Sequence, residues 1–462
     1  MQRSAIEQGR TPQQHCDEYV ALFKQLNARL GVSNDHYVRT TQESHKKTAQ
    51  QLWLMCAQNN DIYLRDHEGY YNEREECFVT DLEAEMTQFK DPVSLKPYKR
   101  VSEQAYFFAM SKYKDSIVKY IEQENVVQPE TAKNELLARL LNPDTSFCLR
   151  DVCISRTSFS WGIPVPEGFD QKHIMYVWFD ALSNYLTGVQ ALDGNSIWPA
   201  DKHIIGKDIT WFHCVIWIAM LMSAKLELPK QVFAHGFVND ADGRKMSKSL
   251  NNTVDPAMIL AKYPVDSIRY YMLTAATYGS DVNFSEQALV SSHNELADSL
   301  GNLVHRAFVL CTKYCQSTIP NTLHNQEFGL PFDLKSLIEQ TPQLAESCSI
   351  NVLLGLAMQA VRDTNKFLTH AEPWKMKHQD QAKRPAVIRT VLEAIYVCSH
   401  FLAPAMPFVT QKVFNKLGPC KRLQDLDCNF YNLVPGTILP QPHGVLFPKL
   451  DVQAPQESGV KT

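Results

Sequence analysis

The chain has 462 residues, of which 44% are hydrophobic and 21% are charged, which is an ordinary composition for a folded protein. This length exceeds what one hydrophobic core usually supports, so we expect two or three domains. The formal net charge of −4 excludes a protein that coats polyanions through charge alone. A local basic or polar face can still bind RNA under this average charge.

The 12 cysteines are not spaced as a zinc site or a disulfide framework. No C-x-x-C pair occurs, and the closest two, Cys311 and Cys315, are one helical turn apart with no second pair. We therefore predict no metal ligands, and reduced, mostly buried thiols in an intracellular protein. The longest apolar stretch, residues 215–224, is too short to span a membrane, and the N-terminal residues lack the apolar core of a secretory signal.

Residues 1–60 alternate helical and extended patterns. The string T-P-Q-Q at 11–14 supplies a cap, a proline at N1 and a glutamine at N3, so it predicts a helix that ends at Gly31. Residues 36–39 fit a short strand, and a second helix begins at one of the two threonines that follow. Helix, strand and helix in succession are typical of a parallel α/β sheet.

The pattern changes after residue 60. Aromatic and charged residues alternate with glycine and proline, which indicates a partly β insertion. Strand-like runs follow at 175–178, 203–205 and 232–238, and residues 286–416 are strongly helical. We predict six segments: half of an α/β domain at 1–60, the insertion at 61–115, the other half at 116–238, a loop region at 239–290, a helical domain at 291–450 and a tail at 451–462.

The string Gly243-Arg-Lys-Met-Ser-Lys-Ser249 follows one of these predicted strands. Lys245 and Lys248 supply mobile positive charge in a glycine-led loop, which suits a triphosphate and the pyrophosphate that forms from it. A bare K-x-x-K would most simply be a solvated basic turn. The full string, between an α/β pattern and a helical region, favours phosphate binding.

Two segments indicate an apolar slot. In residues 175–185, four side chains fall on one wall if a strand turns into a helix, namely Trp178, Ala181, Leu182 and Tyr185. In residues 203–213, Ile209 and His213 are one helical turn apart. A slot with a phenol and an imidazole suits an unbranched thioether, which needs dispersion contact and weak hydrogen bonds. For Trp178 or Ile209 alone, core packing is the better interpretation.

Gly206 and Asp208 lie between a predicted strand and a helix. Glycine lets a ligand approach the backbone, and a carboxylate at the carboxyl edge of a strand can bond ribose hydroxyls. The alternative for Asp208 is a helix cap.

A polar stripe runs along the helical region at Asp298, Asn302 and Arg306. Asparagine and arginine in line can hydrogen-bond unstacked bases, and single-stranded loops are where proteins read RNA sequence. Pro373-Trp374 adds an aromatic platform for stacking. On composition alone, a solvated helix face is the default interpretation of the stripe.

K-M-S-K-S is the second signature of class I aminoacyl-tRNA synthetases, and segments 175–185, 203–213 and 234–237 resemble those of the methionyl branch. The resemblance covers essentially the whole chain. It implies an α/β fold, with a Rossmann-like parallel sheet, an inserted connective subdomain and an all-α anticodon-binding bundle. It also implies a methionine–tRNA ligase that uses ATP, with Mg²⁺, to form methionyl-adenylate and then charges tRNA(Met). We expect no bound zinc, no membrane, a monomer and a cytoplasmic location, with an organelle left open.

The resemblance also implies roles for matching residues, with Lys245 and Lys248 as the catalytic pair. The ATP-binding residues would be Gly206, Asp208, His235, Gly236, Lys245, Met246, Ser247, Lys248 and Ser249. The methionine-binding residues would be Trp178, Ala181, Leu182, Tyr185, Ile209 and His213, with Leu182 where the family often has proline. The anticodon-binding residues would be Asn302, Arg306, Pro373 and Trp374.

One family signature, H-x-G-H, does not occur in the sequence, and His235-Gly236 is the nearest string. Residues 3–8 match the stretch that follows the second ATP-side loop of the family, so the sequence resembles an N-terminally truncated member. Either the recorded start is too late, which we favour, or the chain is a non-catalytic tRNA-binding paralogue. A different class I synthetase is disfavoured by the pocket and anticodon matches. The lone Cys77 departs from members with zinc knuckles in the insertion.

Overall fold

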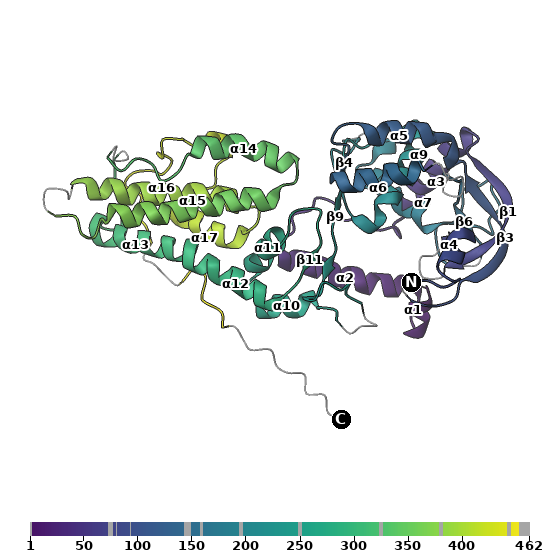
Figure 1. Ribbon diagram of the computed structural model, residues 1–462, viewed down its shortest axis with the longest axis horizontal. Helices are drawn as coiled ribbons and strands as arrows, with labels where there is room; N and C mark the ends of the chain where they lie inside the picture. The colour runs from purple at the N-terminus through teal and green to yellow at the C-terminus, as the bar shows by residue number, and fades with distance from the viewer. Residues whose placement is uncertain are drawn as a thin grey trace, which may run out of the picture. The chain divides into compact units, whose positions relative to one another are not determined.

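The computed structural model describes residues 2–72, 77–79, 81–92, 94–142, 149–157, 160–193, 197–247, 252–322, 327–377, 382–440 and 445–451. The chain divides into two compact units, Met1–Lys24 with Ser33–His235 and Gln25–Val32 with Gly236–Thr462. The helix α2 (Pro12–Leu30) contributes to both units. Figure 1 labels the elements of each unit.

A parallel sheet forms the centre of the first unit. Its strand order is β4-β9-β8, with β4 (Val127–Gln128), β9 (Val232–His235) and β8 (His203–Gly206). Both neighbours run parallel to β9, and Gly206 pairs with His235. Val232 and Ala234 are almost fully buried, as expected for a parallel strand covered on both faces. The predicted α/β class with a parallel sheet is confirmed.

Helices pack around this sheet and share one core with it. They are α3 (Glu43–Gln58), α5 (Lys114–Glu122), α6 (Glu130–Leu140), α7 (Val177–Leu182), α8 (Asn184–Gly188) and α9 (Trp217–Ser223). The core holds the fully buried rings of Trp53, Phe108, Phe179 and Trp217. A short helix, α1 (Gln2–Glu7), precedes α2.

The strand predicted at 36–39 is wrong. This segment has no regular secondary structure, and it pairs with no strand of the described chain. Its side chains pack on helices instead: the Tyr37 ring lies 5.2 Å from the Lys24 ammonium, and Val38 lies against Gly188 of α8. The apolar and aromatic side chains of this segment therefore serve helix packing and not a sheet.

The insertion is built on an antiparallel sheet of order β2-β1-β3-β5. Its strands are β1 (Ile62–Asn72), β2 (Cys77–Val79), β3 (Lys99–Phe108) and β5 (Val152–Cys153), and a short helix, α4 (Asp81–Met86), follows β2. The long curved pair of β1 and β3 in Figure 1 is in register from Ile62–Phe108 to Tyr71–Lys99. Alternation of aromatic and charged residues is what a sheet with one solvated face requires. Two further short strands, β6 (Ser155–Arg156) and β7 (Ile174–Met175), pair with each other.

A buried carboxylate joins the root of this insertion to the rest of the first unit. Asp61 precedes β1, is 2% exposed, and accepts hydrogen bonds from Ser223 Oγ (2.8 Å) and Lys112 Nζ (2.7 Å), as well as from the Tyr113 hydroxyl. Burial alone would raise the pKa of Asp61, but these three hydrogen bonds outweigh it and lower the pKa below its ordinary 3.8. The ionised carboxylate therefore stabilises the fold.

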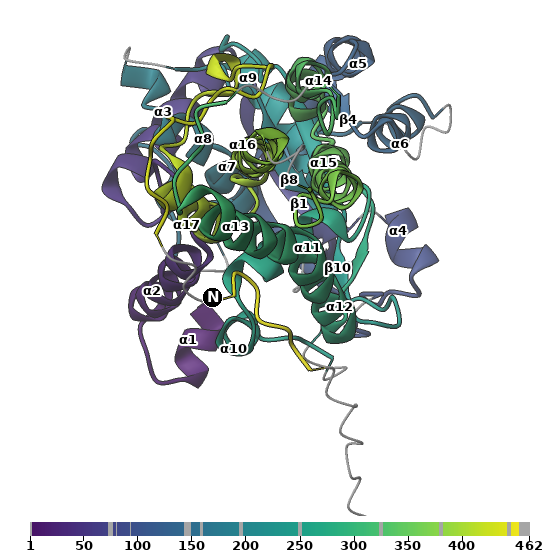
Figure 2. The ribbon, with the colours of Figure 1, turned by 90° about the vertical axis from the view of Figure 1, so that its left-hand side faces the viewer.

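The second unit is helical apart from one pair of two-residue parallel strands, β10 (Val238–Asn239) and β11 (Val282–Asn283), among its described residues. Its helices are α10 (Pro256–Lys262), α11 (Val265–Thr274), α12 (Glu286–Leu296), α13 (Asn302–Cys315), α14 (Leu334–Glu346), α15 (Ile350–Ala371), α16 (Arg384–Leu402) and α17 (Pro407–Leu417). Figure 2 looks along this bundle, in which α16 packs against α13, α15 and α17. The helical character predicted from residue 286 onward agrees with this bundle.

Among the described helices, α16 is long and apolar enough to cross a membrane by composition, yet 94% of its apolar window is buried in the bundle. It also carries a buried ion pair, with Arg389 Nη2 2.9 Å from Glu393 Oε1. Arg389 donates to the carbonyls of Pro320 and Leu433, and Glu393 accepts the backbone N–H groups of Asn432 and Leu433. The charges of α16 thus fasten two irregular segments to the bundle.

The first testable prediction concerns Asp61. Asp61→Asn removes the charge that three donors satisfy, so we expect it to lower the free energy of unfolding by about 2 kcal/mol at neutral pH. Because the folded pKa lies below the unfolded one, this stabilisation is present above about pH 4 and is lost as the pH falls through the folded pKa. Thermal unfolding followed by circular dichroism at several pH values measures both effects.

Asp66→Asn is the matched control, because Asp66 is an exposed carboxylate on the adjoining strand β1. Equal melting temperatures for Asp61→Asn and the wild type at neutral pH would contradict the stabilising role of Asp61.

Candidate functional site

The carboxyl ends of β8 and β9 meet at one edge of the parallel sheet. Gly206 ends β8 opposite His235, which ends β9. A Cβ placed on Gly206 would lie 2.7 Å from Asp208 Oδ1 and 3.8 Å from His235 Cε1. The absence of a side chain at Gly206 therefore lets the Asp208 carboxylate fold back over the backbone. This brings together three of the predicted ATP-binding residues at an edge where α/β sheets bind ligands.

A hydrogen-bonded pair, Tyr185 and His213, lies at the centre of the predicted methionine pocket. The Tyr185 hydroxyl is 2.8 Å from His213 Nε2, and His213 Nδ1 is 2.9 Å from the Ile209 carbonyl oxygen. Because the carbonyl can only accept, Nδ1 carries the proton and Nε2 accepts from Tyr185. Burial lowers the pKa of His213, so the imidazole is neutral at pH 7.

The segment that carries these residues is not a regular α-helix. A 3₁₀ turn, η4 (Lys207–Ile209), leads into a π-helical turn, η5 (Phe212–Ile216), before α9 begins. A π turn inserts one residue into the helical ladder, and such turns are frequent at functional sites. Ile209 is the last residue of the 3₁₀ turn, and His213, four residues later, is the second residue of the π turn.

The other predicted pocket residues lie on α7 and in the segment that follows it. Trp178 is half-buried, with its ring 6.4 Å from the His213 ring, and Ala181 is half-buried one turn further on. Leu182 is 1% exposed and belongs to the core of the first unit. Trp178, Tyr185 and His213 are therefore brought together, and Leu182 belongs to the core against which Trp178 and Tyr185 pack.

His45 holds this wall in place from α3. It is fully buried, and its two ring nitrogens are 2.8 Å from Asp180 Oδ1 on α7 and 3.0 Å from Thr187 Oγ1 on α8. Asp180 and Thr187 lie on either side of Tyr185 in the chain, and Trp178 precedes both. A single imidazole thus bonds to α7 and to α8, the two short helices that carry Trp178 and Tyr185.

The sequence analysis missed an aromatic shell around the pocket. Phe212 stacks on Trp178 with ring centroids 3.8 Å apart, and His203 lies 4.1 Å from the Tyr185 ring. Trp217 Nε1 donates to His203 Nε2 at 3.3 Å, so that nitrogen keeps its lone pair. Burial and the neighbouring His213 lower the pKa of His203 to about 4. The available signal was a histidine in an otherwise apolar strand, followed by the aromatic run at 211–213.

In the second unit, hydrogen bonds to Asp240 and Asn252 fix the start of the K-M-S-K-S loop. Asp240 accepts the backbone N–H of Arg244 (2.8 Å) and the amide of Asn252 (2.8 Å), while Asn252 Oδ1 accepts the backbone N–H of Ser247 (2.8 Å). Lys245 is exposed, and its ammonium lies 4.5 Å from the Phe237 ring. Met246 packs against the small core around α10 and α11. Lys248 and Ser249 lie outside the described residues.

Gly236 stands at the start of this unit, between β9 and the K-M-S-K-S loop. A Cβ there would overlap the backbone of Ser280, so this position requires glycine. The predicted ATP-binding residues thus fall in both units: Gly206, Asp208 and His235 in the first, and Gly236 and 245–247 in the second.

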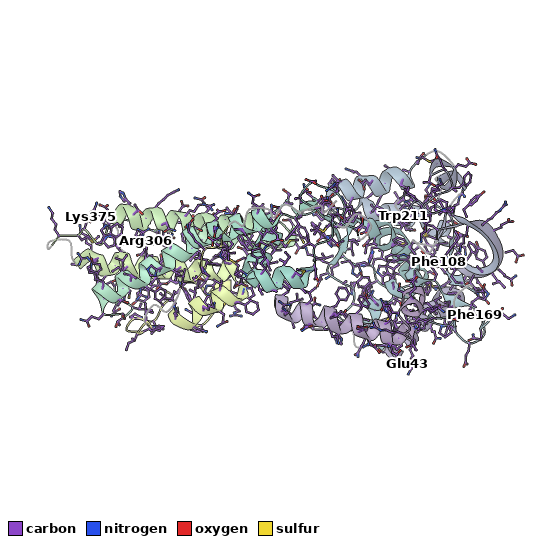
Figure 3. The ribbon with its side chains drawn as sticks, turned by 90° about the horizontal axis from the view of Figure 1, so that it is seen from below. Glu43, Phe108, Phe169, Trp211, Arg306 and Lys375 are labelled. Carbon is purple, nitrogen blue, oxygen red and sulfur yellow. The ribbon has the colours of Figure 1, made fainter. Side chains whose placement is uncertain are left out.

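The predicted anticodon residues gather at one end of the bundle. Figure 3 shows Arg306 on α13 and Lys375 in the turn after α15 close to each other. The Arg306 guanidinium lies 5.5 Å from the ring of Trp374, which is 36% exposed, and Arg306 Nη1 is 3.5 Å from Asn365 Oδ1. Pro373 is buried beneath the turn.

Asn302 is exposed at the start of α13, just after a second π turn, η7 (Ala297–Gly301). Its amide nitrogen donates to the Asp298 carbonyl at 3.1 Å. The Asp298 carboxylate, which belongs to the same polar stripe, pairs with Lys449 at 2.9 Å. This end of α13 and the turn after α15 therefore present an amide, a guanidinium and an indole, while the Asp298 carboxylate is paired with a lysine.

Within the described ranges, no group of three or more His, Cys, Asp or Glu residues is arranged to hold a metal ion. Ten cysteines are free thiols in the part of the chain whose side chains the structure describes.

Comparisons with known proteins agree with this geometry. A family model described as "tRNA synthetases class I (M)" matches residues 1–88 and 83–308. A second, the "Anticodon binding domain of methionyl tRNA ligase", matches residues 350–458. The fold and these matches define a class I aminoacyl-tRNA synthetase.

A methionine–tRNA ligase of Halalkalibacterium halodurans is 36% identical over 98% of this chain and 71% of its own length. A methionine–tRNA ligase of Brucella suis is 34% identical, over 97% of this chain and 88% of its own. The crystal structure of Mycobacterium tuberculosis methionyl-tRNA synthetase bound by methionyl-adenylate has a TM-score of 0.88 at 33% identity, and the match covers 96% of this chain and 89% of that one. The chain belongs to the methionyl-tRNA synthetase family. Its function is the ATP-dependent ligation of methionine to tRNA, which confirms the predicted activity.

The second testable prediction concerns His203. An unfolded histidine binds a proton below about pH 6.5, whereas folded His203 stays neutral down to about pH 4. The contribution of His203 to stability is therefore full above pH 6.5 and is lost toward pH 4, at about 1.4 kcal/mol per pH unit. Urea unfolding at a series of pH values should show a shallower dependence for His203→Gln. Identical pH dependences for the two proteins would refute the neutral, indole-bonded state of His203.

Proposed function

We propose that Trp178, Ala181, Leu182, Tyr185, Ile209 and His213 bind the methionine side chain. The observation that carries this proposal is the bond between Tyr185 and the neutral His213 beside the Trp178–Phe212 stack. Aromatic faces offer dispersion contact to a thioether. Its sulfur is only a weak hydrogen-bond acceptor, so a neutral pocket suits it better than a charged one. A branched or charged side chain would lose this contact or remain unpaired.

We further propose that ATP binds at the carboxyl edge of β8 and β9. Asp208 would bond the ribose, Gly206, His235 and Gly236 would allow the nucleotide to approach the backbone, and residues 245–249 would hold the phosphates. ATP enters with Mg²⁺, so the ion counts here as part of the substrate. The methionyl-adenylate bound to the M. tuberculosis enzyme supports an adenylate intermediate for this chain.

In the first step, the methionine carboxylate attacks the α-phosphorus and pyrophosphate leaves. Positioning matters more than an acid–base pair in such a transfer. Lys245 and Lys248 would stabilise the charge that builds up on the leaving pyrophosphate. In the second step, the acyl group passes to the terminal ribose of the tRNA.

We assign anticodon binding to Asn302, Arg306, Pro373 and Trp374. The spacing of 5.5 Å between the Arg306 guanidinium and the exposed Trp374 ring supports this role, because stacking and hydrogen bonding are the two ways in which unpaired bases are read. The tRNA would be tRNA(Met), whose anticodon is CAU. A monomeric state, a cytoplasmic location and the six segment boundaries remain part of the same proposal.

The third prediction tests the catalytic role of the loop. Lys245→Ala and Lys248→Ala should each lower the rate of methionine-dependent ATP–pyrophosphate exchange by about 10²-fold, because each removes a charge that acts in the transition state. Neither should change the Kd for tRNA by more than about twofold. Lys335→Ala on α14 is the control, since Lys335 is an exposed lysine of the bundle. Unchanged exchange in both loop variants would reject the catalytic assignment, and tRNA binding by a wild-type chain without exchange would favour a non-catalytic tRNA-binding protein.

The fourth prediction tests the proposed RNA-binding face, which consists of Asn302, Arg306, Pro373 and Trp374. Trp374→Ala removes a stacking platform worth about 1–3 kcal/mol, so the Kd for a stem-loop with a CAU anticodon should rise about tenfold. Methionine-dependent exchange should stay at the wild-type rate. Trp374→Phe should keep most of the affinity, because a phenyl ring also stacks. Equal affinity of Trp374→Ala and the wild type would remove Trp374 from the anticodon site.

A further inference from the structure

We propose that Arg384 is a positioning residue for RNA recognition, which fixes the turn that carries Trp374 against α13. The inference rests on the proposed RNA-binding roles of Trp374 and Arg306. Arg384 is not part of the exposed polar stripe; it lies half-buried at the first residue of α16.

Two hydrogen bonds tie Arg384 to the turn on either side of Trp374. Its Nε donates to the Pro373 carbonyl and its Nη2 donates to the Met376 carbonyl, both at 2.7 Å. Both distances are those of strong charge-assisted bonds. The planar fork of one guanidinium therefore fixes the relative positions of two carbonyls that bracket the indole.

The same guanidinium also contacts α13. It lies 4.3 Å from the centroid of the Tyr314 ring, a cation–π contact. Tyr314 is about two helical turns from Arg306 on that helix. Arg384 thus connects the turn that presents the stacking platform with the helix that presents the base-bonding side chains.

Few hydrogen bonds lie within the turn itself, among the residues that the structure describes. After α15 ends, Glu372 adopts a left-handed conformation with φ 40°, and Lys375 N–H donates to the Glu372 carbonyl at 2.8 Å. Glu372 and Lys375 also form an ion pair at 2.8 Å, but both side chains are exposed and such pairs contribute little. Besides the packing of Met376 on the core, Arg384 supplies the two hydrogen bonds that connect this turn to α16.

Lysine is a poor substitute for this role. An ammonium is a point charge that bonds one carbonyl well, whereas the guanidinium holds two carbonyls and stacks on an aromatic ring. If Arg384 instead contacted an RNA phosphate directly, lysine could replace it with little loss of affinity. The two roles are therefore separable by substitution.

The experiment measures the Kd of the full chain for a CAU anticodon stem-loop over a range of salt concentrations. We expect Arg384→Ala to raise the Kd about tenfold. The Kd of Arg384→Lys should lie within twofold of that of Arg384→Ala, and neither substitution should change the slope of log Kd against log salt. In a double-mutant cycle, Arg384→Ala added to Trp374→Ala should have no further effect, because Arg384 acts through the indole. Arg422→Ala is the control, since Arg422 is an exposed arginine paired with Asp425.

Several results would overturn the proposal. One is a Kd for Arg384→Ala within twofold of the wild type, and another is additive effects in the double-mutant cycle. A third is a slope of log Kd against log salt that falls by about one, together with recovery of affinity in Arg384→Lys, because this would make Arg384 a direct phosphate contact. Circular dichroism establishes that the variants are folded. Should Arg384→Ala unfold, Tyr314→Leu removes the ring beneath the guanidinium and should raise the Kd about threefold; no change would count against the proposal. If Trp374→Ala alone has no effect, the RNA-binding face itself fails, which is a distinct outcome.

Discussion

The predicted nucleotide site depends on one pairing register, that of β8 and β9, which run parallel and end with Gly206 opposite His235. Parallel neighbours finish at the same edge of a sheet, so the residues that follow each strand meet there even though a long helical segment separates them in sequence. The register is fixed by β8, in which Ile205 is buried and Ile204 is exposed, because a slip by one residue would exchange these two faces. Glycine then keeps the edge open, since a Cβ on Gly206 would collide with the Asp208 carboxylate.

Each unit uses the same local device to present a polar side chain from a helix. The π turns η5 and η7 lie at the predicted methionine pocket and just before the predicted anticodon residues. In both places a side chain bonds the carbonyl oxygen four residues earlier: His213 that of Ile209, and Asn302 that of Asp298. These bonds set the direction of the imidazole and of the amide. In the predicted pocket, Nε2 of His213 is thereby left to accept from Tyr185, while burial keeps the imidazole neutral.

Much of the site could be predicted from sequence because its chemistry is concentrated in short strings. Lys245 to Ser247, and Trp178 to Tyr185, are close in the chain, so a motif contains nearly all of their geometry. The parallel sheet followed from the apolar runs at 203–205 and 232–238. What could not be predicted depends on contacts between segments that are distant in sequence. His203 owes its low pKa to burial and to the neighbouring His213, and residues 36–39 pack on helices where their pattern suggested a strand. The polar stripe on α13 needed the family resemblance, since exposed polar residues alone fit any solvated helix.

Helix α16 shows why composition is a poor guide to what a segment does. Its apolar sequence is long enough for a membrane, but its two buried charges are satisfied by the protein. Removing Arg389 and Glu393 from water is costly, and the ion pair alone would not recover that cost. Hydrogen bonds to the backbone at 320 and 432–433 offset part of this cost, and they also hold these two irregular segments against α16. Arg384 extends the same principle to the start of the helix, where its donors hold the Trp374 turn. An apolar helix with a few well-bonded arginines can thus serve as the core of a bundle and also fix the surface loops beside it.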